Sequence, residues 1–180
     1  PAPRGTLSLD GVVSGTLGKL AGSLAFRVAD LALRDLSGLR AEGTAALDHR
    51  GLVLDATASL AAGGTLEVHA VAPVKVSLVP ARVRVSRDRP GRVDATLQAL
   101  DLADVQSLLG GLAPRMGGKV DGFVRAEGTL DRPGGTLNLA LREVTFDTLR
   151  NVSGQVDVSV APGETRAVIS LVRRGGQSIR

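Results

Sequence analysis

The sequence contains no cysteine, tryptophan or tyrosine, and its aromatic residues are the three phenylalanines Phe26, Phe123 and Phe146. The lack of cysteine excludes disulfide frameworks and thiolate metal sites, but it does not identify a compartment. Because rings are so few, the 43% of hydrophobic residues are almost entirely leucine, valine and alanine. Compact cores use aromatic residues for the large area that each ring buries. The composition therefore argues against a compact enzyme and favours a surface that stays open or accepts a flexible ligand.

Long hydrophobic runs are also missing. No apolar stretch approaches the ~20 residues of a membrane-spanning helix, and nothing in the chain resembles a cleavable signal peptide. The chain starts at Pro1 without an initiating methionine and stops at Arg180 inside an expected strand. We therefore expect it to be a piece of a longer protein, cut away from any targeting signal.

Motifs for catalysis and metal binding are absent as well. The Gly-Lys pairs that begin at Gly18 and Gly118 lack the upstream glycine of a P-loop and the Ser or Thr that follows its lysine, and no Gly-x-Ser-x-Gly elbow occurs. His49 and His69, in an expected turn and an expected strand, have no His or Cys at ligand spacing. We expect no enzyme activity, no catalytic residue, no metal and no cofactor.

The formal net charge is +4 and the pI about 10.6, and arginine carries most of the positive charge. Such a balance can attract nucleic acid, anionic lipid or an acidic partner. The densest basic group comprises Arg82, Arg84, Arg87, Arg89 and Arg92. It lacks the interleaved aromatic residues that stack bases, so we expect no nucleic-acid partner. A solvated face that protects a sheet edge is favoured over a polyanion site.

Alternation of apolar and polar residues runs through almost the whole sequence. A period of two predicts half-buried strands with one apolar side. The apolar positions change phase by one residue between Val28 and Leu31, and again between Leu141 and Val144. A β-bulge produces such a change, bends the strand and keeps one face apolar. The sequence therefore predicts long strands that carry bulges at both places.

Turn residues separate these strands. His49-Arg50-Gly51 predicts a hairpin turn between two alternating segments, and Asp88-Arg89-Pro90-Gly91 predicts a second turn. The same four residue types recur at Asp131-Arg132-Pro133-Gly134, where we expect a third turn.

The period changes once, between residues 101 and 110. Leu102, Val105 and Leu108 are spaced as on one face of a helix, Gly110-Gly111 is a typical stop, and Asp101 and Asp104 lie at its start as capping residues. We expect one short helix at 101–110, joining the repeat-like units 5–100 and 117–180 within a single segment, 1–180.

Those two units contain copies of one pattern. Residues 15–33 align without a gap on residues 128–146: both begin with Gly-Thr-Leu, continue with the same alternation and include the same change of phase. Repetition of strand units indicates an extended, stacked architecture rather than a closed globule.

Several short segments around the expected helix and after it resemble the C-terminal region of the TamB family, the inner-membrane-anchored component of the translocation and assembly module, which belongs with the AsmA-like proteins. The segments are Leu100-Asp101-Leu102, Leu108-Leu109-Gly110-Gly111-Leu112, Gly118-Lys119-Val120-Asp121-Gly122, Glu127-Gly128-Thr129-Leu130, the Pro133 turn and Gly135-Thr136-Leu137. The leading Gly-Thr-Leu unit fits the same pattern, so the resemblance covers nearly the whole chain.

The resemblance implies an open trough of β-sheet that is lined by aliphatic side chains and spans the periplasm. It implies a role in phospholipid movement between the inner and outer membranes and in outer-membrane biogenesis. Its partners would be phospholipid acyl chains and an outer-membrane barrel protein of the TamA type, and the full-length protein would be anchored in the inner membrane. The family offers no catalytic residues to carry over.

The expected fold class is thus all-β with one short helix: an extended antiparallel sheet, curled into an open trough with one apolar face. Small residues such as Gly122, Ala126 and Gly128 would leave room along that face. The expected lipid-groove lining consists of Leu24, Phe26, Val28, Leu54, Val120, Val124, Leu137, Leu139, Leu141, Val144 and Phe146.

An alternative function is a structural or adhesive β-solenoid of a surface or envelope protein. In that case the apolar face would be a dry, closed core. A transmembrane barrel is disfavoured, because the aromatic girdles of such barrels are missing.

Overall fold

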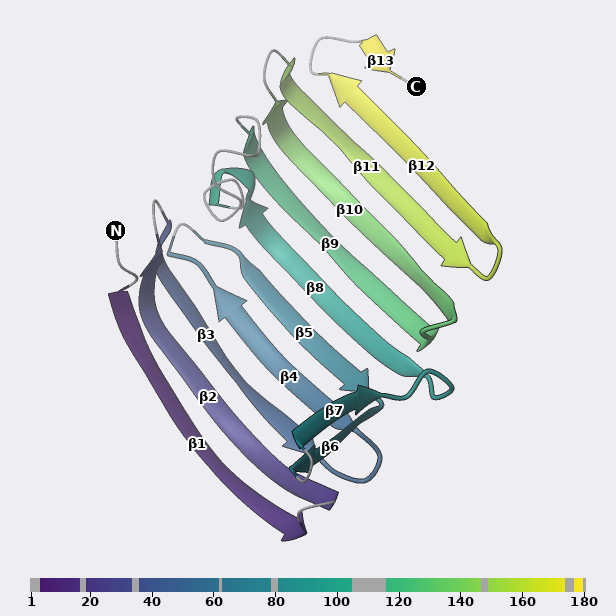
Figure 1. Ribbon diagram of the computed structural model, residues 1–180. Coiled ribbons are helices and arrows are strands. Elements are labelled where there is room, and N and C mark those ends of the chain that lie inside the picture. Colours follow the sequence, from purple (N-terminus) through teal and green to yellow (C-terminus); the bar gives the residue numbers. More distant parts are fainter. Residues whose placement is uncertain are drawn as a thin grey trace.

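One large antiparallel β-sheet dominates the computed structural model (Figure 1). The structure describes residues 4–16, 19–33, 36–61, 63–78, 81–104, 116–146, 149–173 and 177–179. Eleven strands form the sheet, and they lie in the order β1 (Arg4–Thr16), β2 (Lys19–Leu33), β3 (Leu36–Leu47), β4 (Leu52–Ser59), β5 (Thr65–Ala72), β8 (Gly91–Asp101), β9 (Met116–Thr129), β10 (Arg132–Phe146), β11 (Leu149–Ala161), β12 (Glu164–Arg173) and β13 (Gln177–Ile179). The sheet is open, with β1 at one edge and β13 at the other. The all-β, antiparallel part of the expected fold is confirmed.

A separate hairpin, β6 (Val74–Leu78) and β7 (Ala81–Val85), interrupts the strand order between β5 and β8. The amide of Ser86 donates to the carbonyl oxygen of Pro73 (2.8 Å) and closes its base. The hairpin crosses the sheet and lies against β2 (Figure 1). The sequence did not indicate that the chain leaves the large sheet after β5, because the apolar positions keep the same parity from Ala70 through Val74.

The turn expected at His49-Arg50-Gly51 joins β3 and β4. The amide of Asp48 donates to the carbonyl oxygen of Gly51 (2.9 Å), and the carboxylate of Asp48 accepts from the amide of Arg50 (2.7 Å). Short-range bonds of this type are why Asp, Asn and Gly gather at turns. The connection at Asp88-Arg89-Pro90-Gly91 is confirmed between β7 and β8.

The third expected turn was placed too late. Thr129 pairs with Arg132, so Leu130 and Asp131 form the connection between β9 and β10. Pro133 and Gly134 are already strand residues, and Pro133 pairs with Gly128. Gly128 has a φ of 119°, which a glycine adopts without steric cost. The irregular backbone is therefore at Gly128, before the turn. The turn predicted from the residues Asp131-Arg132-Pro133-Gly134 was for this reason placed too late.

Only the start of the expected helix lies within the described residues. Asp101 ends β8 and its carboxylate accepts from the amide of Ala103 (2.8 Å), as an N-cap does. Residues 102–104 are helical. The remainder of the expected helix, including Gly110-Gly111, lies outside the described residues.

Both bulges that the phase changes predicted are present. The register shifts between Val28 and Leu31 in β2, and between Leu141 and Val144 in β10. Asp30 and Glu143 have left-handed φ values, both of 51°, at these shifts. A further shift in β8, between Leu97 and Leu100, surrounds Ala99 (φ 50°), and the alternation up to Ala99 gave no sign of it.

The sequence repeat is a repeat of backbone structure. β2 and β10 are each 15 residues long, and the second begins 113 residues after the first, from Lys19 to Arg132. At the same offset, left-handed or otherwise positive φ values recur in pairs: Gly5 with Gly118, Gly15 with Gly128, Asp30 with Glu143, and Gly38 with Asn151. Two of the three pairs between β12 and β13, Leu171 with Ile179 and Val172 with Ser178, repeat pairs between β4 and β5 at the same offset. The repeat therefore extends over β1–β5 and β9–β13.

The register arranges the side chains in continuous rows across ten strands. Residues paired directly in an antiparallel sheet project from the same side. We call three consecutive alternate rows the aliphatic rows, because Thr165 is their one polar side chain. They are Gly11, Leu24, Ala45, Leu54, Ala70, Val93, Ala126, Gly135, Val160 and Thr165; Leu9, Phe26, Gly43, Ala56, Val68, Ala95, Val124, Leu137, Val158 and Ala167; and Leu7, Val28, Ala41, Ala58, Leu66, Leu97, Gly122, Leu139, Val156 and Ile169.

Apart from the β6–β7 hairpin, no second layer covers the large sheet among the described residues. Only Val120 (5% exposed) and Val152 (6%) are buried hydrophobic residues in this part of the chain. The accessible surface is 12316 Å² for 18.4 kDa, whereas a compact globular protein of that mass exposes about 8,200 Å². The fold therefore depends on strand pairing and on contacts within single rows.

The left-handed backbone at Ala99 generates a prediction about stability. We expect Ala99→Val to destabilise the protein by about 1–2 kcal/mol, because a β-branched residue is strained at positive φ, and Ala99→Gly to be neutral or stabilising. At Ala95, in the same strand but without positive φ, the order should reverse, with glycine the more destabilising change. Urea unfolding of the four variants measures both orders. The same order at both positions would contradict the bulge.

Candidate functional site

The structure places nine of the eleven expected lining residues in common rows. Leu24 and Leu54 share one aliphatic row, Phe26, Val124 and Leu137 share the next, and Val28 and Leu139 share the third. Val120 and Leu141 pair directly in the row that follows, beyond the bulge of β8.

The other two residues, Val144 and Phe146, follow the bulge of β10. Val144 pairs with Val152, and Phe146 pairs with Met116. Since Leu141 pairs with Gly154, two residues from Val152 on β11, the bulge returns Val144 to the side of Leu141. The alternation in the sequence thus identified residues that lie far apart in the chain and that the fold places in common rows.

Many aliphatic side chains in these rows remain accessible. Leu7 is 63% exposed, Leu9 60% and Ile169 57%, at the two ends of the rows. Leu24 and Val160 are also exposed, nearer the middle of the sheet. Single exposed leucines are ordinary on protein surfaces, whereas contiguous exposed apolar patches mark binding surfaces or interfaces.

Glycines in the rows are covered by large neighbours. A Cβ on Gly122 would lie 2.8 Å from Cδ2 of Leu139, and one on Gly43 would lie 2.8 Å from Cζ of Phe26. Gly154 stands in the same relation to Leu171, at 2.7 Å. The expectation that Gly122 leaves room is wrong, because Leu139 occupies that space and the backbone of Asn138 approaches as well. The glycines let neighbouring strands and large side chains pack closely.

Charged and hydroxyl side chains occupy the rows between the aliphatic ones. We call two of them the polar rows: Asp10, Ala25, Thr44, Asp55, His69, Asp94, Arg125, Thr136, Ser159 and Arg166; and Ser8, Arg27, Glu42, Thr57, Glu67, Thr96, Phe123, Asn138, Asp157 and Val168. Because neighbouring residues of a strand project to opposite sides, these rows lie on the side away from the aliphatic rows. Phe123 and Val168 are exposed apolar side chains on that side.

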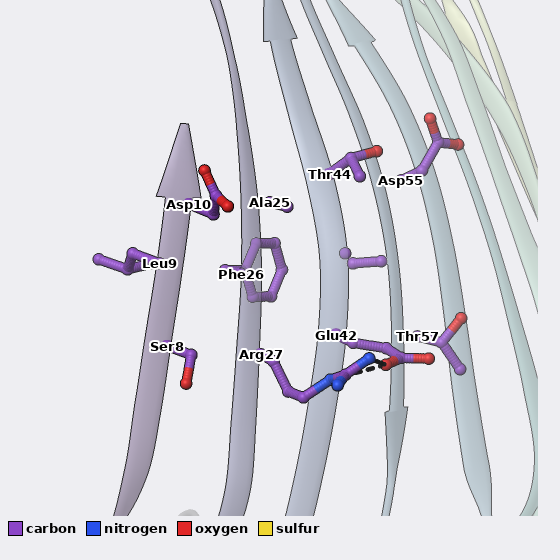
Figure 2. A pocket seen from close by; sticks show the side chains of 12 residues that line it. Ser8, Leu9, Asp10, Ala25, Phe26, Arg27, Glu42, Thr44, Asp55 and Thr57 are labelled. Atoms are coloured by element: carbon purple, nitrogen blue, oxygen red, sulfur yellow. Dashed lines mark hydrogen bonds and ion pairs between the residues drawn. The ribbon is translucent and has the colours of Figure 1, made fainter. Parts of the chain in front are cut away.

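Within each polar row, side chains of neighbouring strands form polar pairs. Arg27 donates to Glu42 (3.1 Å), as Figure 2 shows, and Arg125 donates to Asp94 (2.8 Å). Nδ1 of His69 lies 2.5 Å from Oδ1 of Asp55. All three pairs are direct partners in the register, and in two of them an arginine faces a carboxylate across the strands. Exposed pairs contribute at most about 1 kcal/mol each, and they hold the register more than they add to stability.

A hollow of about 750 Å³ lies over the polar rows of β1–β4 (Figure 2). Eight of its twelve lining residues belong to the polar rows, among them Asp10, Arg27, Glu42 and Asp55. The others belong to the aliphatic row between them, whose backbone forms the floor. The sequence interpretation missed this hollow, because it treated the polar side as solvated backing only.

Two carboxylates are tied into the sheet. Side-chain hydrogen bonds from Arg92 and Arg125 lower the pKa of Asp94 from 3.8 to about 2. The amide of Ala99, which donates to Oδ1 of Asp121 (2.9 Å), lowers the pKa of Asp121, and Arg142 adds to the effect. Asp121 therefore anchors the bulge of β8 from the neighbouring strand.

No group of three or more His, Cys, Asp or Glu side chains in the described residues could hold a metal ion. None of the helical residues within the described ranges forms a segment long and apolar enough to cross a membrane. Comparisons with models of protein families, with curated proteins and with solved structures find no match to this chain.

The lowered pKa of Asp94 generates a prediction about acid stability. A carboxylate with a folded pKa of about 2 and an ordinary value of 3.8 stabilises the fold above about pH 4, and this contribution disappears as the pH falls towards 2. We expect Asp94→Asn to be less stable than the wild type at pH 6 and to match it near pH 2. Chemical unfolding between pH 2 and pH 6 measures the difference.

Asp10→Asn is the matched control, since Asp10 lies in the same row without an ion pair among the described residues. Its difference from the wild type should change less over that range. A constant gap between Asp94→Asn and the wild type would contradict the role of the two arginines.

Proposed function

We propose that the aliphatic rows line an open trough that guides phospholipid acyl chains, as a segment of a periplasm-spanning protein of the TamB type. The observation that supports this most is the unbroken apolar composition of thirty row positions, with Thr165 as the one polar residue. A lipid-guiding surface requires apolar continuity over several strands, because an acyl chain cannot pass a charged side chain without loss of its apolar contacts.

The absence of a covering layer over the described sheet supports the same function. An apolar sheet surface must close on itself, meet another layer or hold a lipid. At about 0.8 kcal/mol per buried methylene, an acyl chain of about 16 carbons that lies against the rows with half of its surface gains about 6 kcal/mol. Such an affinity holds the chain without fixing its position, which suits transport.

The dimensions are also suitable. Strands of 15 residues at about 3.3 Å each are about 50 Å long, and eleven strands at about 4.8 Å give a similar width. The bulges at Asp30, Ala99 and Glu143 lie near the same end of the sheet, and they bend three strands. In the proposed trough these bends curl the sheet around the lipid. The resemblance to the TamB family favours phospholipid as the occupant, outer-membrane biogenesis as the process, and a barrel of the TamA type as the partner.

The alternative, a structural or adhesive β-solenoid with a dry core, is less well supported. A dry core requires the aliphatic side chains to be buried, whereas Leu24 in β2, Val93 in β8 and Val160 in β11, none of them an edge strand, are all more than a third exposed.

Photo-crosslinking tests which side meets lipid. We expect a photoreactive amino acid at Val124 to capture phospholipid in cells or from vesicles, and one at Phe123 not to. The two positions are adjacent in β9, Phe123 is apolar and exposed, and they belong to opposite sides of the sheet. Equal capture at both positions would contradict the proposal, since it would show that any exposed apolar side chain suffices.

A charge within the rows gives a second test. We expect Leu139→Asp to weaken binding of a fluorescent fatty acid at least tenfold, because the acyl chain would have to pass an unpaired carboxylate. Asn138→Asp, one residue away on the opposite side, is the control for added charge. Unchanged binding by folded Leu139→Asp, with its fold checked by circular dichroism, would overturn the proposed function.

A further inference from the structure

The β6–β7 hairpin and the turn after it concentrate the positive charge of the protein. Residues 74–90 contain five basic residues and one acidic residue, Asp88, so their formal charge of +4 equals that of the whole chain. The basic residues are Lys75, Arg82, Arg84, Arg87 and Arg89, and all five are exposed. The rest of the chain is neutral in sum, which makes this segment the one place where the net charge of the molecule resides.

These five cations have no ion pair with the described residues, unlike several arginines of the large sheet. Arg27 pairs with Glu42, Arg40 with Asp30, and Arg92 with Asp94. Arg92, which the sequence analysis grouped with these arginines, thus differs from them because its charge is paired. The charge of the hairpin is left for a partner outside the chain.

The register sorts the hairpin into two faces. Lys75 pairs with Arg84, and Ser77 with Arg82, so three cations share one face. Val74 pairs with Val85, and Val76 with Val83, on the other face. Val83 is 70% exposed and Val85 48%. The hairpin is therefore amphipathic, and the sheet that it crosses does not cover its apolar face at Val83.

Protection of the edges of the large sheet does not explain this charge. Basic residues on a terminal strand discourage pairing with other chains, but the edges of the large sheet are β1 and β13, and the hairpin lies between β5 and β8 in the chain. Both strands of the two-stranded sheet β6–β7 are edge strands, so the edge-protecting role expected for Arg82, Arg84, Arg87 and Arg89 stays a prediction for this small sheet.

We propose that the β6–β7 hairpin docks on an anionic phospholipid bilayer, with its cations on the phosphate headgroups and with Val83 and Val85 at the interface. Arg82 and Arg84 alternate with Val83 and Val85 along β7, so docking through the edge of this strand brings both faces of the hairpin to the bilayer. Basic side chains together with exposed apolar ones are the combination that binds a membrane surface. Nucleic acid is a poorer match, because the hairpin has no aromatic residue for base stacking. The proposal uses other residues than the aliphatic rows, so it stands or fails independently of acyl-chain binding.

Removal of three positive charges at two different places, with the same final net charge, tests the cationic face. The triple variant Lys75→Gln, Arg82→Gln, Arg84→Gln is compared with Arg132→Gln, Arg150→Gln, Arg166→Gln, which removes three exposed arginines of the large sheet. Each basic residue near an anionic surface contributes roughly fivefold in affinity. We expect the hairpin variant to bind vesicles with 30% phosphatidylglycerol on the order of a hundredfold more weakly than the wild type, and the sheet variant less than tenfold more weakly.

Equal losses in the two triple variants would overturn the proposal, because they would show attraction to net charge alone. So would undiminished binding to vesicles of phosphatidylcholine only, or tighter binding to single-stranded RNA than to the anionic vesicles. Thermal unfolding of both triple variants confirms that they remain folded, and the fluorescent fatty acid should bind to both as to the wild type.

A fluorescence measurement tests the apolar face. The chain has no tryptophan, so Val83→Trp introduces a single reporter on the hairpin. We expect its emission to shift to shorter wavelength with the anionic vesicles. Val172→Trp, at an exposed position of β12, is the control and should not shift. A shift of the control alone, or no shift at Val83 while the vesicles are bound, would contradict docking through the hairpin.

Discussion

Side-chain parity across antiparallel strands is the constraint on which the rest of this structure depends. Each strand alternates between two sides, so one inserted residue would move every later side chain to the wrong side. Bulges with left-handed residues at Asp30, Ala99 and Glu143 absorb such insertions. The rows consequently remain apolar across ten strands. Long, bent strands and a continuous apolar surface thus have one common cause in the backbone.

A single layer follows from the same arrangement. With large residues lying over glycines, as Leu139 over Gly122 and Phe26 over Gly43, the sheet packs within itself rather than against a second layer. Cross-strand ion pairs, such as Arg125 with Asp94, keep the register on the other side. The fold therefore reaches a well-defined register while a large apolar surface remains accessible, which is the property that the proposed lipid function uses.

Much of this architecture could be predicted from the sequence, since period and phase are local signals. The strands, the bulges near Asp30 and Glu143 and the repeat followed from parity alone. The start of the β6–β7 hairpin could not be predicted in this way, because Val74 and Val76 of β6 continue the parity of β5. Pro73, which lacks an amide donor, was the available sign there, and the parity changes only later, at Val83 and Val85 of β7. The bulge at Ala99 was hidden because the alternation up to it is regular, and its partner Asp121 lies on another strand. The covering of Gly122 depends on a cross-strand neighbour, which the order of residues does not reveal.

The most direct test of the proposed function compares neighbouring methyl groups on opposite sides of one strand. Ile169 and Val168 are 57% and 45% exposed, and they belong to an aliphatic row and a polar row respectively. A phospholipid with a spin label on its acyl chain broadens the nuclear magnetic resonance signals of nearby methyl groups. If the aliphatic rows hold acyl chains, the methyl signals of Ile169, Val156 and Leu139 should broaden while that of Val168 stays sharp. Equal broadening at Ile169 and Val168 would contradict a lipid site on the aliphatic rows.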